Sequence, residues 1–411
     1  MKNRTVARRR RSSCHVHREP EPQRLEKTST FQPGSRHGAA PFDKPKVWFL
    51  AMALFLFLLP ACQPADAALP GPTTVPTSTS TTLPGPTPPP SPTPSAAQLM
   101  YPYTIDGLRQ HSYQSGKIAI TSTVETTDTY TRYLIRYPSD GLGITGVMQI
   151  PVNGHPPFPV IIMNHGYFDR EGYVPGDGTY RAADYLNKYG YLTLASDYRS
   201  WGQSDIGPSF FYDGLAIDVI NLMNAIPSVP QADPNRVGIW GHSMGGGVTA
   251  KVLTLDARPK AAVFYSTVSA DDAELISLWG TGCIGDIHAG ELSSNCNSSD
   301  IVPLSLPSDL IQAYRTASYD PNLLRQISPI DHLDLVSAPV EIAYGTKDSP
   351  ALGGASPDWS KNLFQAFKDA DKNAQLFAYE GQYHSFNGDA WLAFMDRTTQ
   401  FFDQYVKDST R

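Results

Sequence analysis

The chain has 411 residues, and its charges are divided unevenly between an N-terminal segment and the rest. Residues 1–46 carry 12 Lys and Arg against four Asp and Glu. The remaining residues carry 21 Lys and Arg against 35 Asp and Glu, which gives them a net charge of −14. A folded part this acidic argues against nucleic acid or an anionic membrane surface as the substrate. Of the four cysteines, only Cys283 and Cys296 lie in the part that we expect to fold.

The N-terminal segment has the pattern of an export signal. Residues 1–46 lack hydrophobic periodicity, so we expect them to be disordered. The 14-residue apolar run Val47–Pro60 follows two lysines, which is typical of a signal sequence rather than of a full membrane span. It leads into LPAC at residues 59–62, which resembles a bacterial lipobox, where Cys62 would carry the lipid. An ordinary secretory signal or a short anchor is the alternative, and each of these predicts export, to the bacterial cell surface or the medium.

Residues 63–97 form a predicted linker. They contain 11 Pro, eight Thr and four Ser among 35 residues and no Lys or Arg, so they cannot form a core. Proline at this density favours an extended chain of about 3.1 Å per residue, which would hold a domain up to roughly 100 Å from a membrane or wall. Globular composition follows, so we predict one folded domain over residues 98–411.

Strand and helix patterns predict an α/β architecture for this domain. The first three strands alternate in polarity, which predicts an antiparallel lead-in sheet. The later strands are short and apolar and alternate with helices, which predicts a doubly wound, mostly parallel sheet. The predicted strands are 117–125, 130–137, 143–151, 159–163, 191–196, 237–240, 261–265, 340–344 and 375–379, and the predicted helices are 180–189, 212–226, 248–255, 359–370 and 391–406.

Residues 268–337 interrupt this alternation. The segment is far longer than the helix of about a dozen residues that a crossover between parallel strands needs. We therefore expect a helical cap inserted over the site. The run Ser269–Glu274 contains three acids that could bind an amine, but its spacing favours a helix N-cap followed by first-turn acids.

Cys283 and Cys296 bracket a loop rich in Gly, Ser and Asn within this cap. In an exported protein we expect the two to form a disulfide, which would contribute on the order of 3 kcal/mol for a loop of about 14 residues. Two free thiols are the alternative.

Residues 241–245, GHSMG, match the pattern G-x-S-x-G at the end of a predicted strand. The outer glycines allow a sharp turn from strand to helix, which exposes the Ser243 hydroxyl as a nucleophile. The same turn directs the Met244 backbone N–H at the place where an oxyanion would form. A Gly-rich turn with an inert serine is the alternative.

A serine nucleophile needs a histidine base and an acid that orients the base. In the order serine, acid, histidine, the chain supplies Asp348 after its eighth predicted strand and His384 after its ninth. Because the carboxyl ends of parallel strands meet at one edge, we expect both to lie near Ser243. Asp331 and Asp334 are rival acids, but they precede the eighth strand and would emerge at its opposite end.

A second oxyanion donor is expected in Asn164–Tyr167, which follows the first wholly apolar strand. We predict the backbone N–H of Tyr167, with Phe168 as the alternative, although His165 and Gly166 could form a simple turn. The sequence contains no Cys and His cluster with metal-ligand spacing, so we expect no metal and no cofactor.

Five segments in order resemble a known family: IIMNHGYF, SDYRSWGQSD, DPNRVGIWGHSMGG, SPIDHLDLVSAPVEIAYGTKD and YEGQYHSF. Over roughly residues 130–408 they are similar to the catalytic domain of the prolyl oligopeptidase family and its esterase relatives. The resemblance implies the α/β-hydrolase fold, with Ser243 as nucleophile, Asp348 as acid and His384 as base. The chain has no room upstream for a β-propeller, and GHSMGGG is similar to the elbow of cutinase-like polyester hydrolases, which lack a cap of this size. Both departures favour esters over peptides.

Three functions follow as hypotheses. The first is a serine hydrolase that cleaves carboxylic esters of small molecules through an acyl-enzyme. The second is a serine peptidase of the prolyl oligopeptidase type that acts on short peptides. The third is a catalytically inactive hydrolase fold used as a binding module. We expect contact with a membrane only through the N-terminal lipid or anchor.

Overall fold

The computed structural model describes residues 94–285 and 296–408. The predicted signal with Cys62, and all of the predicted linker up to residue 93, lie outside the described residues. Within the described part, no helix combines the length and the apolar character that crossing a bilayer requires.

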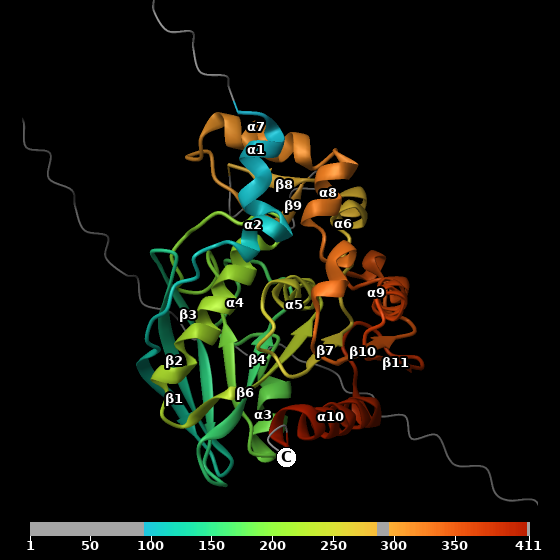
Figure 1. Cartoon of the computed structure of the whole chain (residues 1–411). Coiled ribbons are helices and arrows are strands. Elements are labelled where there is room, and N and C mark those ends of the chain that lie inside the picture. The colour runs from blue at the N-terminus through green and yellow to red at the C-terminus, as the bar shows by residue number, and fades with distance from the viewer. Residues whose placement is uncertain (1–93, 286–295, 409–411) are drawn as a thin grey trace, which may run out of the picture. The chain divides into compact units, whose positions relative to one another are not determined.

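A nine-stranded sheet forms the centre of the described domain (Figure 1). Its order is β1-β2-β3-β5-β4-β6-β7-β10-β11, with antiparallel pairing from β1 to β5 and parallel pairing from β5 to β11. The strands are β1 Ala119–Thr126, β2 Tyr130–Ser139, β3 Leu142–Pro151, β4 Phe158–Asn164, β5 Leu192–Ser196, β6 Ala232–His242, β7 Ala262–Tyr265, β10 Val340–Gly345 and β11 Ala374–Tyr379. The predicted mostly parallel sheet with antiparallel lead-in strands is therefore confirmed.

Helices cover both faces of the sheet, so its central strands are buried on both sides. All seven residues of β4 are buried, and its alternate side chains belong to two separate cores. Helices α4 (Asp213–Ala225), α5 (Met244–Leu255) and α9 (Pro357–Asp369) pack in one core, and α3 (Tyr180–Lys188) and α10 (Gly388–Phe402) in the other. Each buried aliphatic or aromatic side chain stabilises the fold by roughly 1.5–3 kcal/mol.

Helix α5 begins four residues earlier than the sequence pattern predicts. Three successive glycines make its first turn, and glycine weakens the helical pattern. The structure requires them, because a Cβ at Gly245 would lie 2.1 Å from the Asn164 carbonyl oxygen and one at Gly246 would lie 2.1 Å from Thr267 Oγ1. The glycines therefore let α5 pack directly on the neighbouring strand ends.

The predicted cap contains both helices and a small sheet. Its elements are α6 Asp272–Trp279, β8 Gly282–Ile284, β9 Asn297–Val302, α7 Ser308–Ala317, α8 Pro321–Ile327 and the 3-10 helix η4 Pro329–Leu335. The run does begin a helix with first-turn acids Asp272 and Glu274, but the N-cap is Asp271, whose side chain accepts from the Ala273 N–H, and Ser269 lies before the helix. Paired backbone hydrogen bonds between Ser209 and Ile301, of 2.9 and 2.8 Å, join β9 to the core.

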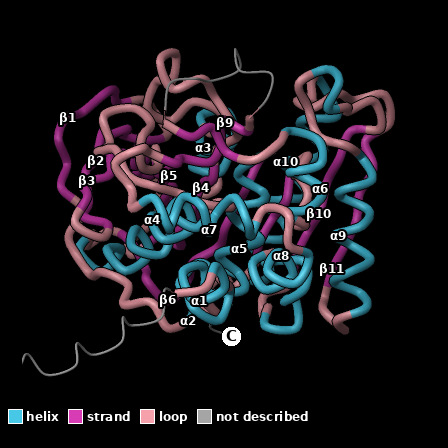
Figure 2. The backbone as a smooth tube through the Cα atoms, turned by 90° about the horizontal axis from the view of Figure 1, so that it is seen from above, coloured by secondary structure: helices cyan, strands magenta, loops and turns pink. Residues whose placement is uncertain are grey.

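Two short N-terminal helices also pack on the cap. Helices α1 (Ala96–Met100) and α2 (Ile105–Arg109) lie beside α7 and α8, although more than 190 residues separate them in sequence (Figures 1 and 2). Met100 is fully buried in a third core together with Tyr314 and Leu324 of the cap. Helices of five residues are too short to show a periodic pattern, so the sequence does not predict them.

A buried charge cluster lies between the cap and α5. Lys251 Nζ contacts Asp213 Oδ1 at 2.7 Å, and the carboxyls of Asp272 and Asp300 are buried nearby. Asp300 accepts a hydrogen bond from the Tyr314 hydroxyl, whereas Asp272 Oδ2 has no hydrogen-bond partner among the described residues. Burial, which outweighs the attraction of Lys251, raises the pKa of Asp272 to about 7.

We expect Asp272→Asn to flatten the pH dependence of thermal stability. The folded chain keeps a proton on Asp272 up to about pH 7, whereas the unfolded chain releases it near pH 4. The stabilisation from this group is therefore full below about pH 4 and is lost as the pH rises to about 7. Melting temperatures between pH 5 and pH 8 should fall less steeply in the variant.

Asp309→Asn is the matched control, because Asp309 is an exposed acid in the first turn of cap helix α7. The control should keep the wild-type slope. Identical slopes in Asp272→Asn and the wild type would contradict the assignment.

Candidate active site

Ser243 occupies a strained turn between β6 and α5. Its backbone has φ 57° and ψ −123°, a conformation that costs a non-glycine residue about 1–3 kcal/mol. Three backbone hydrogen bonds hold it: the Ser243 N–H donates to the Tyr265 carbonyl at 3.0 Å, and its carbonyl accepts from Gly246 at 2.9 Å and from Val268 at 3.2 Å. The strand–turn–helix context predicted for this motif is present.

The glycines of the motif have no room for a side chain. A Cβ at Gly241 would lie 2.4 Å from the Gly245 carbonyl oxygen. The strand end and the first helical turn therefore approach each other directly beneath Ser243. This contact explains the G-x-S-x-G spacing by steric exclusion.

Asp348 and His384 meet on the loops after β10 and β11. His384 Nδ1 lies 2.9 Å from Asp348 Oδ2, and Asp348 Oδ1 accepts from the Ser349 and Ala355 N–H groups at 2.8 and 3.0 Å. The Asp348 side chain is 2 % exposed. A carboxylate in this position accepts the Nδ1 proton, so the neutral imidazole keeps its lone pair on Nε2.

His242, the residue before the serine, supports the loop that carries His384. Their ring centroids lie 4.6 Å apart, and His242 Nε2 lies 3.2 Å from the His384 carbonyl oxygen. Burial, followed by the neighbouring His384, lowers the pKa of His242 to about 3, so this ring is neutral at physiological pH and donates from Nε2. His242 precedes Ser243 in the sequence, which does not indicate this contact with His384.

The loop after β4 passes close to Ser243. A Cβ at Gly166 would lie 3.0 Å from the Ser243 Cβ, so the backbone at Gly166 packs directly against Ser243. The next residue, Tyr167, therefore lies at the same site. The preceding His165 is fully buried, with Nδ1 2.7 Å from the Gly166 carbonyl oxygen and Nε2 3.3 Å from that of Asp197. Burial lowers the pKa of His165 to about 4, which makes it a neutral structural residue.

A cavity of about 570 Å³ connects these residues. The predicted residues Ser243, Met244, His384 and Tyr167, together with the alternative Phe168, line it. Asp348 lies behind His384. The opposite walls come from the cap and from neighbouring loops, and they include Tyr212, Val268, Leu278, Trp279, Asn297, Ser298 and Ser299. Among the described lining residues there is no Asp, Glu, Lys or Arg.

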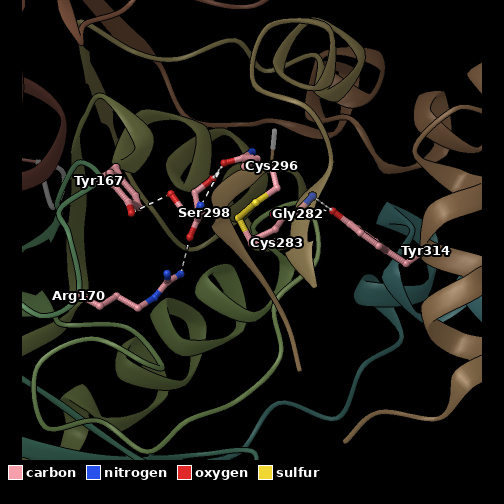
Figure 3. Close-up of a disulfide and its surroundings, with 10 residues drawn as sticks. Tyr167, Arg170, Gly282, Cys283, Cys296, Ser298 and Tyr314 are labelled. Atoms are coloured by element: carbon pink, nitrogen blue, oxygen red, sulfur yellow. Dashed lines mark hydrogen bonds between the residues drawn. A yellow bond between two sulfur atoms is a disulfide. The ribbon is translucent and has the colours of Figure 1, made fainter. Parts of the chain in front are cut away.

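Cys283 and Cys296 form a disulfide in the structure, with their Cα atoms 4.9 Å apart (Figure 3). Cys296 and the next three residues line the cavity. The disulfide is therefore part of a cavity wall, a position that the spacing of the cysteines does not indicate.

Among the described residues, no group of three or more His, Cys, Asp or Glu is arranged to hold a metal ion.

Part of the chain is similar in sequence to known hydrolases. A family model described as serine aminopeptidase, S33, matches residues 155–290. Lysophosphatidylserine lipase ABHD12 is 33% identical over 96 residues in Xenopus tropicalis, covering 23% of each chain, and 35% identical over 95 residues in Bos taurus, covering 23% of this chain and 22% of that one. The chain thus spans about a quarter of the length of these curated relatives.

Two solved structures show the same fold at low sequence identity. An acetyl xylan esterase from Paenibacillus sp. R4 has a TM-score of 0.51 and 17% identity, covering 77% of this chain and 97% of that chain. A puromycin-hydrolyzing peptidase of Mycobacterium tuberculosis has a TM-score of 0.50 and 19% identity, covering 67% of this chain and 39% of that chain.

The sheet order, the turn at Ser243 and these similarities define the α/β-hydrolase fold. The chain therefore has the α/β-hydrolase fold, and the proteins that it resembles in sequence are serine hydrolases.

We expect Gly354→Ala to separate Asp348 from His384. The new methyl group would lie 2.0 Å from Asp348 Oδ1 and 3.0 Å from His384 Cβ, so one of them must move. A displacement of this size should lower kcat/KM on p-nitrophenyl acetate by about tenfold or more. Gly172→Ala is the control, because its methyl group would meet nothing closer than the Asp169 carbonyl oxygen at 3.9 Å. Equal activity of the two variants would show that the contact at Gly354 does not matter.

Proposed function

We propose that the protein is a serine hydrolase that cleaves carboxylic esters of small, uncharged molecules through an acyl-enzyme on Ser243. The observation that carries the proposal is the hydrogen bond between Asp348 and His384 at a cavity that Ser243 also lines. An acid that fixes the tautomer, a histidine that can accept a proton and a serine that lines the cavity are the groups that acyl transfer requires.

In the first half-reaction, the Ser243 oxygen attacks the ester carbonyl carbon, and its proton passes to His384 Nε2. The carbonyl electron pair moves onto the oxygen, giving a tetrahedral oxyanion. When the carbonyl re-forms, the bond to the alcohol oxygen breaks, and that oxygen takes the proton from His384. Asp348 stabilises the intermediate imidazolium and keeps its proton on Nδ1.

In the second half-reaction, water replaces the alcohol. His384 removes a proton from the water, whose oxygen attacks the acyl carbon. Collapse of the second tetrahedral intermediate breaks the bond to Ser243, which regains its proton from His384. The carboxylic acid leaves, and the enzyme returns to its starting state.

We assign the oxyanion site to the backbone N–H groups of Met244 and Tyr167. Met244 opens helix α5, where the helix dipole adds to the attraction for a negative oxygen. Tyr167 belongs to the loop that passes over Ser243. Each such donor typically contributes about 3 kcal/mol in the transition state.

The cavity walls favour an ester over a peptide. Recognition of a peptide amine needs a nearby carboxylate, and none lies among the described lining residues. The aromatic and aliphatic walls suit an apolar acyl or alcohol group. The match to a serine aminopeptidase family model supports the second candidate, hydrolysis of short peptides.

We also propose export and surface tethering through the N-terminal segments, on the sequence patterns alone.

Two substrates separate the candidates. We expect the full chain to hydrolyse a p-nitrophenyl acyl ester faster than an aminoacyl p-nitroanilide, because no described lining residue binds the amine. A faster reaction with the anilide would instead establish the peptidase.

We expect Ser243→Ala and His384→Ala each to lower kcat by about 10³-fold or more, because the triad acts as a unit. Ser360→Ala is the matched control, since Ser360 is buried in α9 and its hydroxyl has no hydrogen-bond partner among the described residues. Wild-type protein that a fluorophosphonate probe does not label would support the inactive binding module.

A further inference from the structure

We propose that Ser298, on cap strand β9, is a positioning residue for the oxyanion loop Gly166–Arg170, and that the Cys283–Cys296 disulfide holds Ser298 in place. The inference rests on the proposed function, because it assigns a role in turnover to a contact beside the proposed oxyanion site. It makes the cap a working part of the catalytic machinery as well as a wall of the cavity.

Ser298 contacts the oxyanion loop at two points (Figure 3). Its hydroxyl donates to the Tyr167 phenolic oxygen at 2.8 Å, and its carbonyl accepts from Arg170 Nη2 at 2.6 Å. The two contacts are three residues apart on the loop, so together they restrain both its position and its orientation. Tyr167 is the residue whose backbone N–H we assign to the oxyanion.

The core fixes the same loop from the other side. Trp201 is fully buried; its Nε1 donates to the Phe168 carbonyl at 2.9 Å, and the Arg170 guanidinium lies 4.0 Å from its ring centroid. Arg170 therefore lies between a rigid indole of the core and a carbonyl of the cap. The loop is restrained from both sides, and Ser298 provides the restraint from the cap.

The disulfide determines where Ser298 lies. Cys296 precedes Ser298 by two residues and is bonded to Cys283 of strand β8. Strand β8 is held in turn by the Tyr314 hydroxyl, which accepts from the Gly282 N–H at 2.6 Å. At its other end, β9 is joined to the core through Ile301. Ser298 thus belongs to a segment that is anchored on both sides.

A loop restrained in this way should act on the chemical step. Negative charge develops on the carbonyl oxygen in the transition state and is absent from the bound substrate, so a shift of the Tyr167 N–H weakens transition-state binding more than substrate binding. Loss of the restraint should therefore lower kcat and leave KM nearly unchanged. Loss of a wall contact with the substrate would instead raise KM.

The test is a double-mutant cycle with Tyr167→Phe and Ser298→Ala, measured on p-nitrophenyl acetate. Each single variant removes one hydroxyl of the pair and keeps the backbone groups. We expect each to lower kcat by about three- to tenfold, the size of one neutral hydrogen bond, with KM within about twofold. The double variant should be no slower than the slower single variant.

Ser318→Ala is the matched control, because it removes a buried cap hydroxyl, bonded to the Tyr314 carbonyl, that does not line the cavity. Its kcat should equal that of the wild type. Additive effects in the cycle, or a change confined to KM, would overturn the role of Ser298. If Ser243→Ala retains full activity, the proposed function itself fails, which the cycle alone does not imply.

A second arm tests the disulfide. The double variant Cys283→Ser with Cys296→Ser should lower kcat to the level of Ser298→Ala, and adding Ser298→Ala should lower it little further. An unchanged kcat would show that the disulfide does not hold Ser298. If melting shows that the cysteine variant does not fold, the cycle at Tyr167 and Ser298 still decides the role of Ser298.

Discussion

The left-handed backbone at Ser243 is the constraint on which the rest of the site depends. A non-glycine residue adopts this conformation only where the surrounding contacts stabilise it by more than the conformation costs. Here the contacts are backbone hydrogen bonds to Tyr265, Gly246 and Val268. Two of these residues follow or end strand β7, so the strained turn is possible only once the parallel sheet has formed. The position of Ser243 at the cavity thus depends on the whole sheet.

The same dependence explains why much of the site could be predicted from sequence. Asp348 and His384 each follow a parallel strand, and the carboxyl ends of such strands meet at one edge whatever the loops contain. Order along the chain and strand assignment were therefore sufficient to bring the two together. The sequence pattern places the start of α5 too late, because glycines that serve close packing weaken a helical pattern.

Contacts that depend on the cap could not be predicted in this way. Ser298 and Tyr167 are 131 residues apart, and no periodic pattern joins them. Strand β8 has three residues, too few for an alternation to be recognised. Lys251 is a further case, because a lysine on a helix is normally exposed, and its complete burial follows only from the carboxyls that the cap and α4 place around it.

These polar contacts explain how the cap keeps one position on the core. Apolar surfaces tolerate small shifts, whereas a buried ammonium that loses its partner carboxylate costs several kcal/mol, roughly 3–5 for a broken pair. Lys251 is paired with Asp213 of α4, so this pair fixes α4 against α5, beneath the buried Asp272 of α6 and Asp300 of β9. The disulfide and the contacts of Ser298 act on the same segment at the cavity itself. Because the wall and the oxyanion loop share these restraints, a change that loosens the cap should affect turnover before it affects the overall fold.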